Sequence, residues 1–344
     1  MIFPPVGARL LAALLIAGSA AWSAEPEAVS GRAMGTTWSA KWIPGPTPAA
    51  PEYVSRELAS LLERLEEIFS TYRPASELSR FNRARTTGWI PVSPELAAAA
   101  VRSRAVSELT GGAFDATVEP LLELWGIGPH PAPKKEPEPA AIAAALARIG
   151  WRHLEVRAEP PALRKAKPDL AVDFSSVAKG LAADAMGKCL TRLGLPNHLV
   201  GVGGDLRAAG PGPGGSGWPV GIEDPAAGST RPTRTLLLRD AALSTSGNHR
   251  NVRLIGGRRV GHILDARTGR PVSGPLLAVS VVAPGGAEAS GLATGLFALG
   301  ADDGDSLARR EGIAAVFLVE SSGSIAARET PAFARLPPAS AQRR

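Results

Sequence analysis

Five polar, glycine-containing segments follow one another through the second half of the chain and carry residue types suited to holding a phosphorylated ligand. They are VDFSSVAKG from Val172, GVGGDL from Gly201, STSGN from Ser244, GHILDARTG from Gly261 and EASGLATG from Glu288. Small residues let backbone amides approach a ligand closely, and loops carried by apolar elements are where binding residues gather. The set therefore indicates a site for an anionic, phosphate-containing molecule.

Two of these segments carry side chains that can act on such a ligand. VDFSSVAKG places Asp173 ahead of a helix and Lys179 about one turn inside it, where free N–H groups and a cation can hold a phosphate. GHILDARTG places His262 and Asp265 on either side of two apolar residues. Taken singly, a capped helix with a solvated lysine and a structural histidine also explain these residues, so the segments carry weight only as a set.

Several common catalytic motifs are absent from the sequence. GVGGDL does not complete GxGxxG, because Leu206 stands where the third glycine is needed. The chain also lacks GxxxxGK[ST], GxSxG, a paired CxxC and HExxH. Dinucleotide-binding Rossmann domains, P-loop kinases, common serine hydrolases and zinc enzymes are thus excluded on motif grounds.

Composition allows a folded protein with a large core. The chain has 344 residues, of which 44% are hydrophobic, enough for one large domain or two modest ones. The net charge is +6, but basic residues are mixed with acidic ones and aromatic residues make up only 5%. No basic stripe alternates with aromatic residues, so we expect no nucleic-acid partner.

The N-terminal residues have the features of a secretory signal peptide. Arg9 precedes an apolar run over residues 10–17, and small residues follow up to Ala24. No other run approaches the roughly 20 residues of a spanning helix. The single cysteine, Cys189, can form no internal disulfide, and no cysteine follows the signal to accept a lipid. We divide the chain into a signal peptide (1–24), one domain (25–335) and a flexible tail (336–344), and expect an exported protein.

The apolar pattern predicts a mixed α+β fold. We expect strands over residues 36–42, 153–156, 198–202, 278–282 and 313–319. We expect helices over residues 54–69, from Ser93 to before Gly111, and over 139–149, 175–193 and 289–299. Polar segments then lie between or beside these elements, where a scaffold can position them.

Upstream segments complete a recognisable order of motifs. Met34-Gly35-Thr36, STYRP from Ser70, SRFN from Ser79 and GAFD from Gly112 precede the five segments. The whole series resembles the ApbE family, the FAD:protein FMN transferases of bacterial envelopes, over roughly residues 32–319. The resemblance implies mixed sheets flanked by helices in two closely packed lobes. It also implies transfer of FMN from FAD, through a phosphoester, to a threonine or serine of a partner protein, with release of AMP.

The resemblance also implies the site residues. Those that would line the FAD site are Met34, Tyr72, Ala113, Phe114, Asp115, Asp173, Lys179 and Leu264. Met34, Tyr72 and Leu264 offer apolar or aromatic faces to flat rings, and Lys179 can neutralise phosphate. A Mg²⁺ ion would be held by the main-chain oxygen of Ser176 and the side chains of Ser290 and Thr294.

The chain departs from the family pattern at Ser290, where most relatives carry aspartate. A serine hydroxyl brings no charge to a cation that prefers carboxylate oxygens. Glu288 lies two residues away, about 200° round a helix, and is poorly placed to replace the missing carboxylate.

The resemblance leaves three activities open. The first is FMN transfer to an acceptor flavoprotein of an envelope redox complex, in the periplasm, with His262 or Asp265 assisting proton removal. The second is hydrolysis of FAD to FMN and AMP. The third, raised by Ser290, is a non-catalytic protein that binds or delivers flavin.

Overall fold

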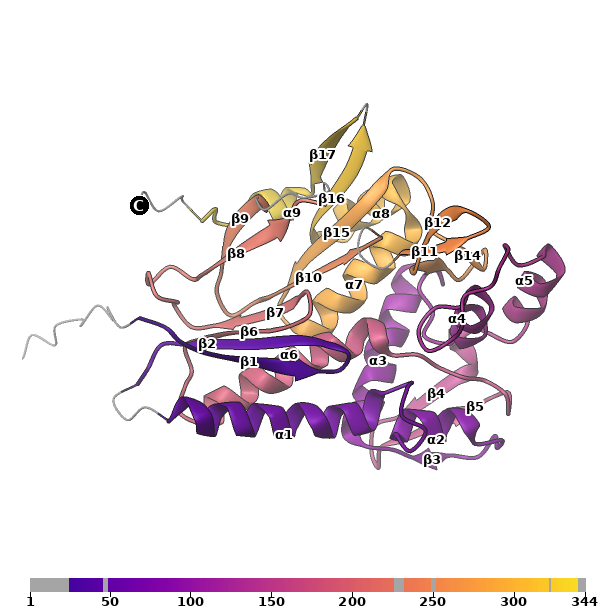
Figure 1. Ribbon diagram of the computed structural model, residues 1–344, viewed down its shortest axis with the longest axis horizontal. Helices are drawn as coiled ribbons and strands as arrows, with labels where there is room; N and C mark the ends of the chain where they lie inside the picture. The colour runs from indigo at the N-terminus through magenta and orange to yellow at the C-terminus, as the bar shows by residue number, and fades with distance from the viewer. Residues whose placement is uncertain (1–24, 46–48, 226–231, 249–251, 322, 340–344) are drawn as a thin grey trace, which may run out of the picture.

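The computed structural model describes residues 25–45, 49–225, 232–248, 252–321 and 323–339 (Figure 1). The predicted signal peptide therefore lies outside the described residues. Within them the α+β prediction is confirmed: helices cover one face of a large antiparallel sheet, and several smaller sheets surround it. No helix of the described ranges is both long and apolar enough to span a bilayer.

The large sheet has eight strands in the order β1-β2-β6-β7-β10-β15-β16-β17, and each neighbouring pair is antiparallel. The strands are β1 (Glu27–Ala33), β2 (Thr36–Trp42), β6 (His198–Val202), β7 (Asp205–Ala209), β10 (Ala242–Gly247), β15 (Leu276–Ala283), β16 (Ala314–Ser321) and β17 (Ser324–Glu329). Strands from both ends of the chain thus form one surface, which brings the polar segments between them together.

Smaller sheets complete the strand content. They are β3-β5-β4 and the hairpins β8–β9, β11–β12 and β13–β14. Their strands are β3 (Ile90–Pro91), β4 (Leu154–Arg157), β5 (Ala162–Lys165), β8 (Trp218–Glu223), β9 (Pro232–Leu238), β11 (Val252–Ile255), β12 (Arg258–Gly261), β13 (Leu264–Asp265) and β14 (Arg270–Pro271).

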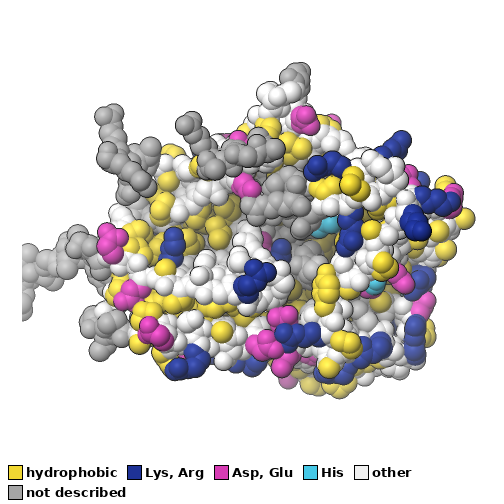
Figure 2. Space-filling view, viewed as in Figure 1, with side chains coloured by type: hydrophobic (Ala, Val, Ile, Leu, Met, Phe, Trp, Pro, Cys, Tyr) yellow, Lys and Arg dark blue, Asp and Glu magenta, His cyan; other side chains and the backbone are white. Residues whose placement is uncertain are grey.

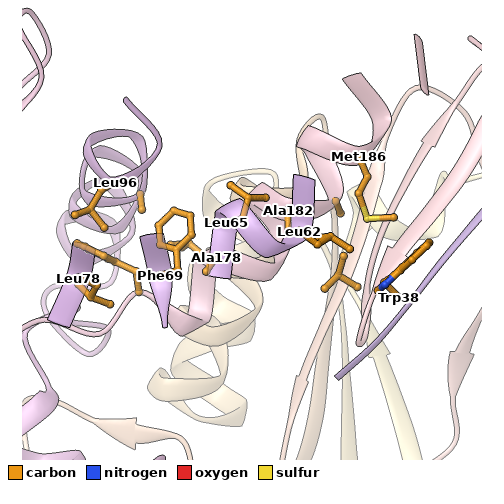
Figure 3. Close-up of a cluster of buried hydrophobic side chains, with 14 of the residues drawn as sticks. Trp38, Leu62, Leu65, Phe69, Leu78, Leu96, Ala178, Ala182 and Met186 are labelled. Atoms are coloured by element: carbon orange, nitrogen blue, oxygen red, sulfur yellow. The ribbon is translucent and has the colours of Figure 1, made fainter. Parts of the chain in front are cut away.

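The helices follow the predicted periodicity closely. They are α1 (Pro51–Phe69), α2 (Glu77–Arg83), α3 (Pro94–Leu109), α4 (Glu119–Trp125), α5 (Pro139–Leu146), α6 (Ser175–Arg192), α7 (Gly286–Leu299), α8 (Ala301–Arg310) and α9 (Pro331–Ala334). Helix α1 buries its predicted apolar stripe against α6, as Figure 3 shows for Leu62 and Leu65 beside Ala178 and Ala182. Ser93 caps α3 as expected, accepting a hydrogen bond from Leu96 N at 3.2 Å.

Each face of the large sheet has its own core. On one face, β2 and β6 pack against α1 and α6, and β15 and β16 pack against α7 and α8. On the other face, hairpin β8–β9 covers Leu243, Ala278 and Leu318. Alternation along the strands therefore decides which side chains face α6 and α7 and which face the hairpin.

Helices α6 and α7 cross at two glycines. A Cβ atom added to Gly180 would lie 2.2 Å from the main-chain oxygen of Gly286, so only glycine permits this approach. Asp184 of α6 accepts hydrogen bonds from Gly286 N at 2.7 Å and Ala287 N at 3.1 Å. This cap lets α7 begin at Gly286, three residues before the predicted start.

Several elements of the described residues were not predicted. They are helices α2, α4, α8 and α9 and strands β1, β3, β5, β7 to β14 and β17. Strand β1, at the sheet edge, alternates only between partial burial and exposure. Residues 336–339, assigned to the tail, lie against β9: Leu237 N donates to Pro337 O at 2.9 Å, and Leu336 packs in the core under β8–β9. Residues 340–344 are outside the described ranges.

Candidate active site

Three of the predicted segments meet around Lys179. Gly203, in the turn between β6 and β7, donates from its N–H to Thr37 O at 2.9 Å. A Cβ on Gly203 would lie 3.3 Å from Thr36 Oγ1 and 3.6 Å from Lys179 Cδ. The β1–β2 turn, the β6–β7 turn and the first turns of α6 therefore meet at one lysine.

Met34 and Tyr72 are linked through one side chain of α1. Met34 N donates to Glu66 Oε2 at 3.1 Å, and Glu66 Oε1 lies 3.3 Å from an Arg73 guanidinium nitrogen. Tyr72 itself is 68% exposed, and Met34 is half-buried. Glu66 thus connects the β1–β2 turn at Met34 to Arg73, the residue after Tyr72, and the exposed ring of Tyr72 is available to a flat ligand.

Asp173 lies just before α6, whose N-cap residue is Phe174, and its carboxylate holds the first N–H of the helix. Its Oδ1 accepts from Ser175 N at 2.7 Å. Asn82 fixes the preceding residue, since its amide nitrogen donates to Val172 O and its oxygen accepts from Val172 N, both at 2.9 Å. One hydrogen bond leaves acceptor capacity on the half-buried Asp173 carboxylate for a ligand donor.

The 113–115 segment is buried, and its carboxylate is fully engaged by the protein. Asp115 accepts from Thr117 N and Thr117 Oγ1 at 2.7 Å each and from Trp151 N at 2.7 Å. Burial raises the pKa of Asp115, and these three hydrogen bonds act against that rise. Ala113 and Phe114 are buried as well, so the segment forms the structural base of the site, and its predicted contact with FAD stays a prediction.

The GHILDARTG segment lies directly against that base. Ala266 N donates to Ala113 O at 3.0 Å, and Leu264 is buried with α4 and α5. Asp265 is held by Arg267 through Nε at 3.0 Å and a terminal nitrogen at 2.9 Å. His262 is half-buried between β12 and β13. The two candidate proton acceptors therefore differ, because the Asp265 carboxylate is already paired with the Arg267 guanidinium.

The three predicted cation ligands come together where α6, α7 and β10 meet. Ser290 Oγ lies 2.7 Å from Ser176 O, and Thr294 Oγ1 donates to Ser290 O at 3.1 Å. Ser246 Oγ of β10 lies 2.9 Å from Thr294 Oγ1. Ser176 O and Ser290 Oγ are thus in direct contact, and the hydroxyls of Thr294 and Ser246 follow one helical turn further along α7. Such neutral oxygens suit a hard cation once a carboxylate joins them.

A carboxylate does join them, from a residue that the sequence did not assign to the site. Asp205, the first residue of β7, lies 2.9 Å through Oδ2 from Ser290 Oγ and accepts a short hydrogen bond from Ser244 Oγ. Burial raises its pKa, while the charge of Lys179 and the hydrogen bonds from Ser244 and Ser290 favour the ionised form. The oxygen donors present therefore fit Mg²⁺, although no group of three or more His, Cys, Asp or Glu side chains gathers among the described residues.

Glu288 takes no part in this cluster, as its helical position predicted. It forms an ion pair with Arg102 of α3 at 3.8 Å, on another side of α7 from Ser290. The sequence missed three contributors: Glu66, Asp205 and Ser246. Asp205 lies in the GVGGDL segment and Ser246 in the STSGN segment. Membership of these segments was the only sequence feature that pointed to them, because their partners are remote in sequence.

One hollow on the surface lies apart from the predicted site residues. A hollow of about 450 Å³ is lined by loop residues 214–217, β8, β9 and Ala339, and none of the predicted site residues contributes to it. Basic and acidic side chains are interspersed on the face drawn in Figure 2. The distribution on that face agrees with a small anionic ligand better than with a nucleic-acid groove.

Comparison with known proteins gives consistent results. The ApbE family model matches residues 34–317. The FAD:protein FMN transferase of Salmonella typhimurium is 37% identical over 86% of this chain and 85% of its own, and that of Klebsiella pneumoniae is 35% identical over 95% of each. The solved flavin transferase ApbE from Vibrio cholerae superposes with a TM-score of 0.82 at 33% identity, covering 91% of this chain and 99% of that one. The apo flavinyl transferase ApbE of Pseudomonas stutzeri gives 0.82 at 35% identity, covering 92% and 98%.

Proposed function

The chain belongs to the ApbE family, and we propose from this premise that it is an FAD:protein FMN transferase. It moves FMN from FAD to a threonine or serine hydroxyl of an acceptor protein and releases AMP. Curated relatives with this name match most of the chain. The observation that carries the proposal is the meeting of three motif-bearing segments around Lys179, beside a carboxylate and hydroxyl cluster.

The proposed reaction is a displacement at phosphorus. The acceptor hydroxyl oxygen forms a bond to the phosphorus on the riboflavin side of FAD. The bond from that phosphorus to the oxygen bridging to the adenosine phosphate breaks, and AMP leaves with this oxygen. Lys179 stabilises negative charge on the phosphates. The hydroxyl proton passes to a base, and since Arg267 occupies Asp265, we assign this role to His262.

We further propose Mg²⁺ as the cofactor. The residues that would hold it are Ser176, through its main-chain oxygen, Thr294 and the cluster around Ser290. When bound, the ion neutralises charge on the pyrophosphate and on the leaving AMP. Met34 and Tyr72 would contact the flavin ring, and Asp173 would accept a hydrogen bond from FAD.

We propose that the protein acts in the periplasm on a flavoprotein subunit of an envelope redox complex. The support is the signal-like composition of residues 1–24 and the lack of a spanning helix among the described residues. A fusion of residues 1–30 to alkaline phosphatase should be active in a Gram-negative host. An inactive fusion that accumulates in the cytoplasm would contradict export.

The activity is tested by incubating the purified protein with FAD, Mg²⁺ and an acceptor fragment containing the modified threonine. A fluorescent acceptor band that survives denaturing electrophoresis, with one AMP released per FMN attached, is the expected result. AMP release without a labelled acceptor would identify FAD hydrolysis instead. FAD binding with neither product would identify a carrier.

A further inference from the structure

The proposed reaction gives no role to the buried carboxylate of Asp205, although this residue lies within the site. Asp205 is only 2% exposed and faces α6 and α7 from the first position of β7. Its side-chain contacts are the hydroxyls of Ser244 and Ser290. A buried carboxylate is costly unless hydrogen bonds and opposite charge compensate it, and two hydroxyls bring no charge.

Ser290 serves two acceptors with one proton. Its Oγ lies 2.7 Å from Ser176 O and 2.9 Å from Asp205 Oδ2. A hydroxyl donates a single hydrogen bond, so Ser290 cannot serve both oxygens at once. Ser176 O keeps the N–H of Gly180 in its own helix as donor, whereas Asp205 Oδ2 loses the Ser290 proton whenever the hydroxyl turns to the carbonyl. A cation beside Ser290 would bind the carboxylate oxygen together with the second lone pair of the carbonyl.

We propose that Asp205, together with Ser176 O and Thr294 Oγ1, holds the divalent cation and supplies the negative charge that Ser290 lacks. The inference rests on the proposed function, which places a cation beside the pyrophosphate. One carboxylate combined with neutral oxygens, water and substrate phosphate is an ordinary environment for Mg²⁺. The acidic ligand then comes from the sheet instead of from α7.

The neighbouring acidic residues are committed elsewhere. Asp184 caps the start of α7 and lies 3.7 Å from the Arg207 guanidinium. Glu288 pairs with Arg102 of α3. Among the described residues, neither side chain forms a hydrogen bond or ion pair with Ser176, Ser290 or Thr294. Asp205, in contrast, contacts Ser290 directly.

Lys179 brings positive charge close to Asp205. Its side chain passes the turn at Gly203, two residues before Asp205. When FAD binds, the phosphates compete for this lysine, and the carboxylate loses part of its compensation. Cation binding and FAD binding should therefore strengthen one another.

The test moves the carboxylate from one side of the cluster to the other. We would measure Mn²⁺ binding, by loss of the free-ion electron paramagnetic resonance signal, with and without FAD and without acceptor. Asp205→Asn should weaken Mn²⁺ affinity roughly tenfold or more, since even residues behind metal ligands contribute that much. Adding Ser290→Asp to Asp205→Asn should restore most of the affinity, because the new carboxylate reaches the same place.

Glu288→Gln provides the matched control, since it removes an acidic side chain of α7 that faces α3. It should leave Mn²⁺ affinity unchanged. A folded Asp205→Asn protein that binds Mn²⁺ as tightly as the wild type would overturn the inference, and so would a double variant that recovers nothing. If the wild type labels an acceptor in either case, the proposed function stands and only the role of Asp205 fails.

Discussion

At the scale of single residues, Met34 is held in a backbone conformation that does not suit it. The two-residue turn between β1 and β2 has φ of 52° at Met34 and 69° at Gly35. Such turns favour Asn-Gly, since side chains other than asparagine and aspartate are strained at positive φ. Strain of this kind is common at ligand sites, which agrees with the predicted contact of Met34 with the flavin.

Met34→Asn should therefore separate stability from binding. We expect the variant to be more stable to urea by about 1 kcal/mol, because the strain is relieved, and to bind FAD more weakly, because the thioether is lost. Urea unfolding and quenching of FAD fluorescence measure the two effects. Gain of stability with unchanged FAD affinity would remove Met34 from the ring contacts.

In contrast to Met34, Asp115 is expected to stabilise the fold, so its substitution should lower stability. An asparagine at this position offers only one acceptor oxygen, while the carboxylate now accepts from Thr117 through one oxygen and from Trp151 N through the other. Asp115→Asn should lower the free energy of unfolding by about 1–3 kcal/mol, the cost of a buried donor left unpaired. Thermal unfolding measures the loss, and an unchanged melting temperature would show that the loop rearranges freely.

Lys165 predicts a dependence of stability on pH. Burial, with a smaller effect of Arg85, lowers the pKa of this lysine from 10.5 to about 8, while Asp169 acts the other way. Between pH 8 and 10.5 the unfolded chain then binds more protons at this residue than the folded chain. The contribution of Lys165 to stability should rise with pH across that window.

Comparison of urea unfolding for the wild type and Lys165→Met from pH 7 to 10.5 isolates this effect. The difference in unfolding free energy should shift in favour of the wild type as pH rises above 8. A constant difference would mean that Lys165 keeps its ordinary pKa in the folded protein. Lys165 also donates hydrogen bonds to the carbonyls of Asn82 and Leu170. The variant lacks these bonds at every pH, so their loss does not change how the difference in unfolding free energy depends on pH.

At the scale of elements, the crossing of α6 and α7 places the cation cluster. Ser176 and Gly180 lie one turn apart on α6, as do Gly286 and Ser290 on α7. The close approach of Gly180 to Gly286 therefore sets how near Ser176 O comes to Ser290 Oγ. A substitution at either glycine should therefore change the distance between Ser176 O and Ser290 Oγ.

Gly180→Ala places a methyl group within 2.2 Å of Gly286 O and should force the helices apart. We expect a loss of stability of about 1–3 kcal/mol, as for other overpacked cores, together with weaker Mn²⁺ binding. Gly214→Ala, where nothing lies within 4 Å of the added atom, is the control and should change neither. If the Gly180→Ala protein is destabilised but binds Mn²⁺ as the wild type does, the helix crossing does not determine the geometry of the cation ligands.

The longer elements with a clear apolar pattern or cap were predictable, whereas the short elements and the pairing of strands were not. The stripe from Val54 to Phe69 gave α1, and Ser93 gave the start of α3, because both signals are local. Asp205 shows the limit. Its partners Ser244 and Ser290 follow 39 and 85 residues later, and they meet it only through the order β7-β10 and the α6–α7 crossing. Neither feature is encoded in a local pattern.

At the scale of the whole molecule, one face of the large sheet carries site residues and the other face carries only a hydrophobic core. Its helix-covered face carries Asp205, Ser244 and Ser246 toward α6 and α7. Its other face is closed by β8–β9, and residues 337–339 extend that hairpin along β9. Changes to the hairpin face should therefore alter stability while leaving the site intact.

Two truncations test this division. Ending the chain after Arg335 removes Leu336 from the core and the pairing of Pro337 and Ala339 with β9, whereas ending it after Ala339 keeps both. The shorter protein should melt a few degrees lower, since the partly buried Leu336 and the pairing with β9 together contribute about 1–2 kcal/mol. Both should bind FAD equally at a temperature where both are folded. If the shorter chain loses FAD affinity while folded, the two faces of the sheet are coupled, because the deleted segment contacts none of the predicted site residues.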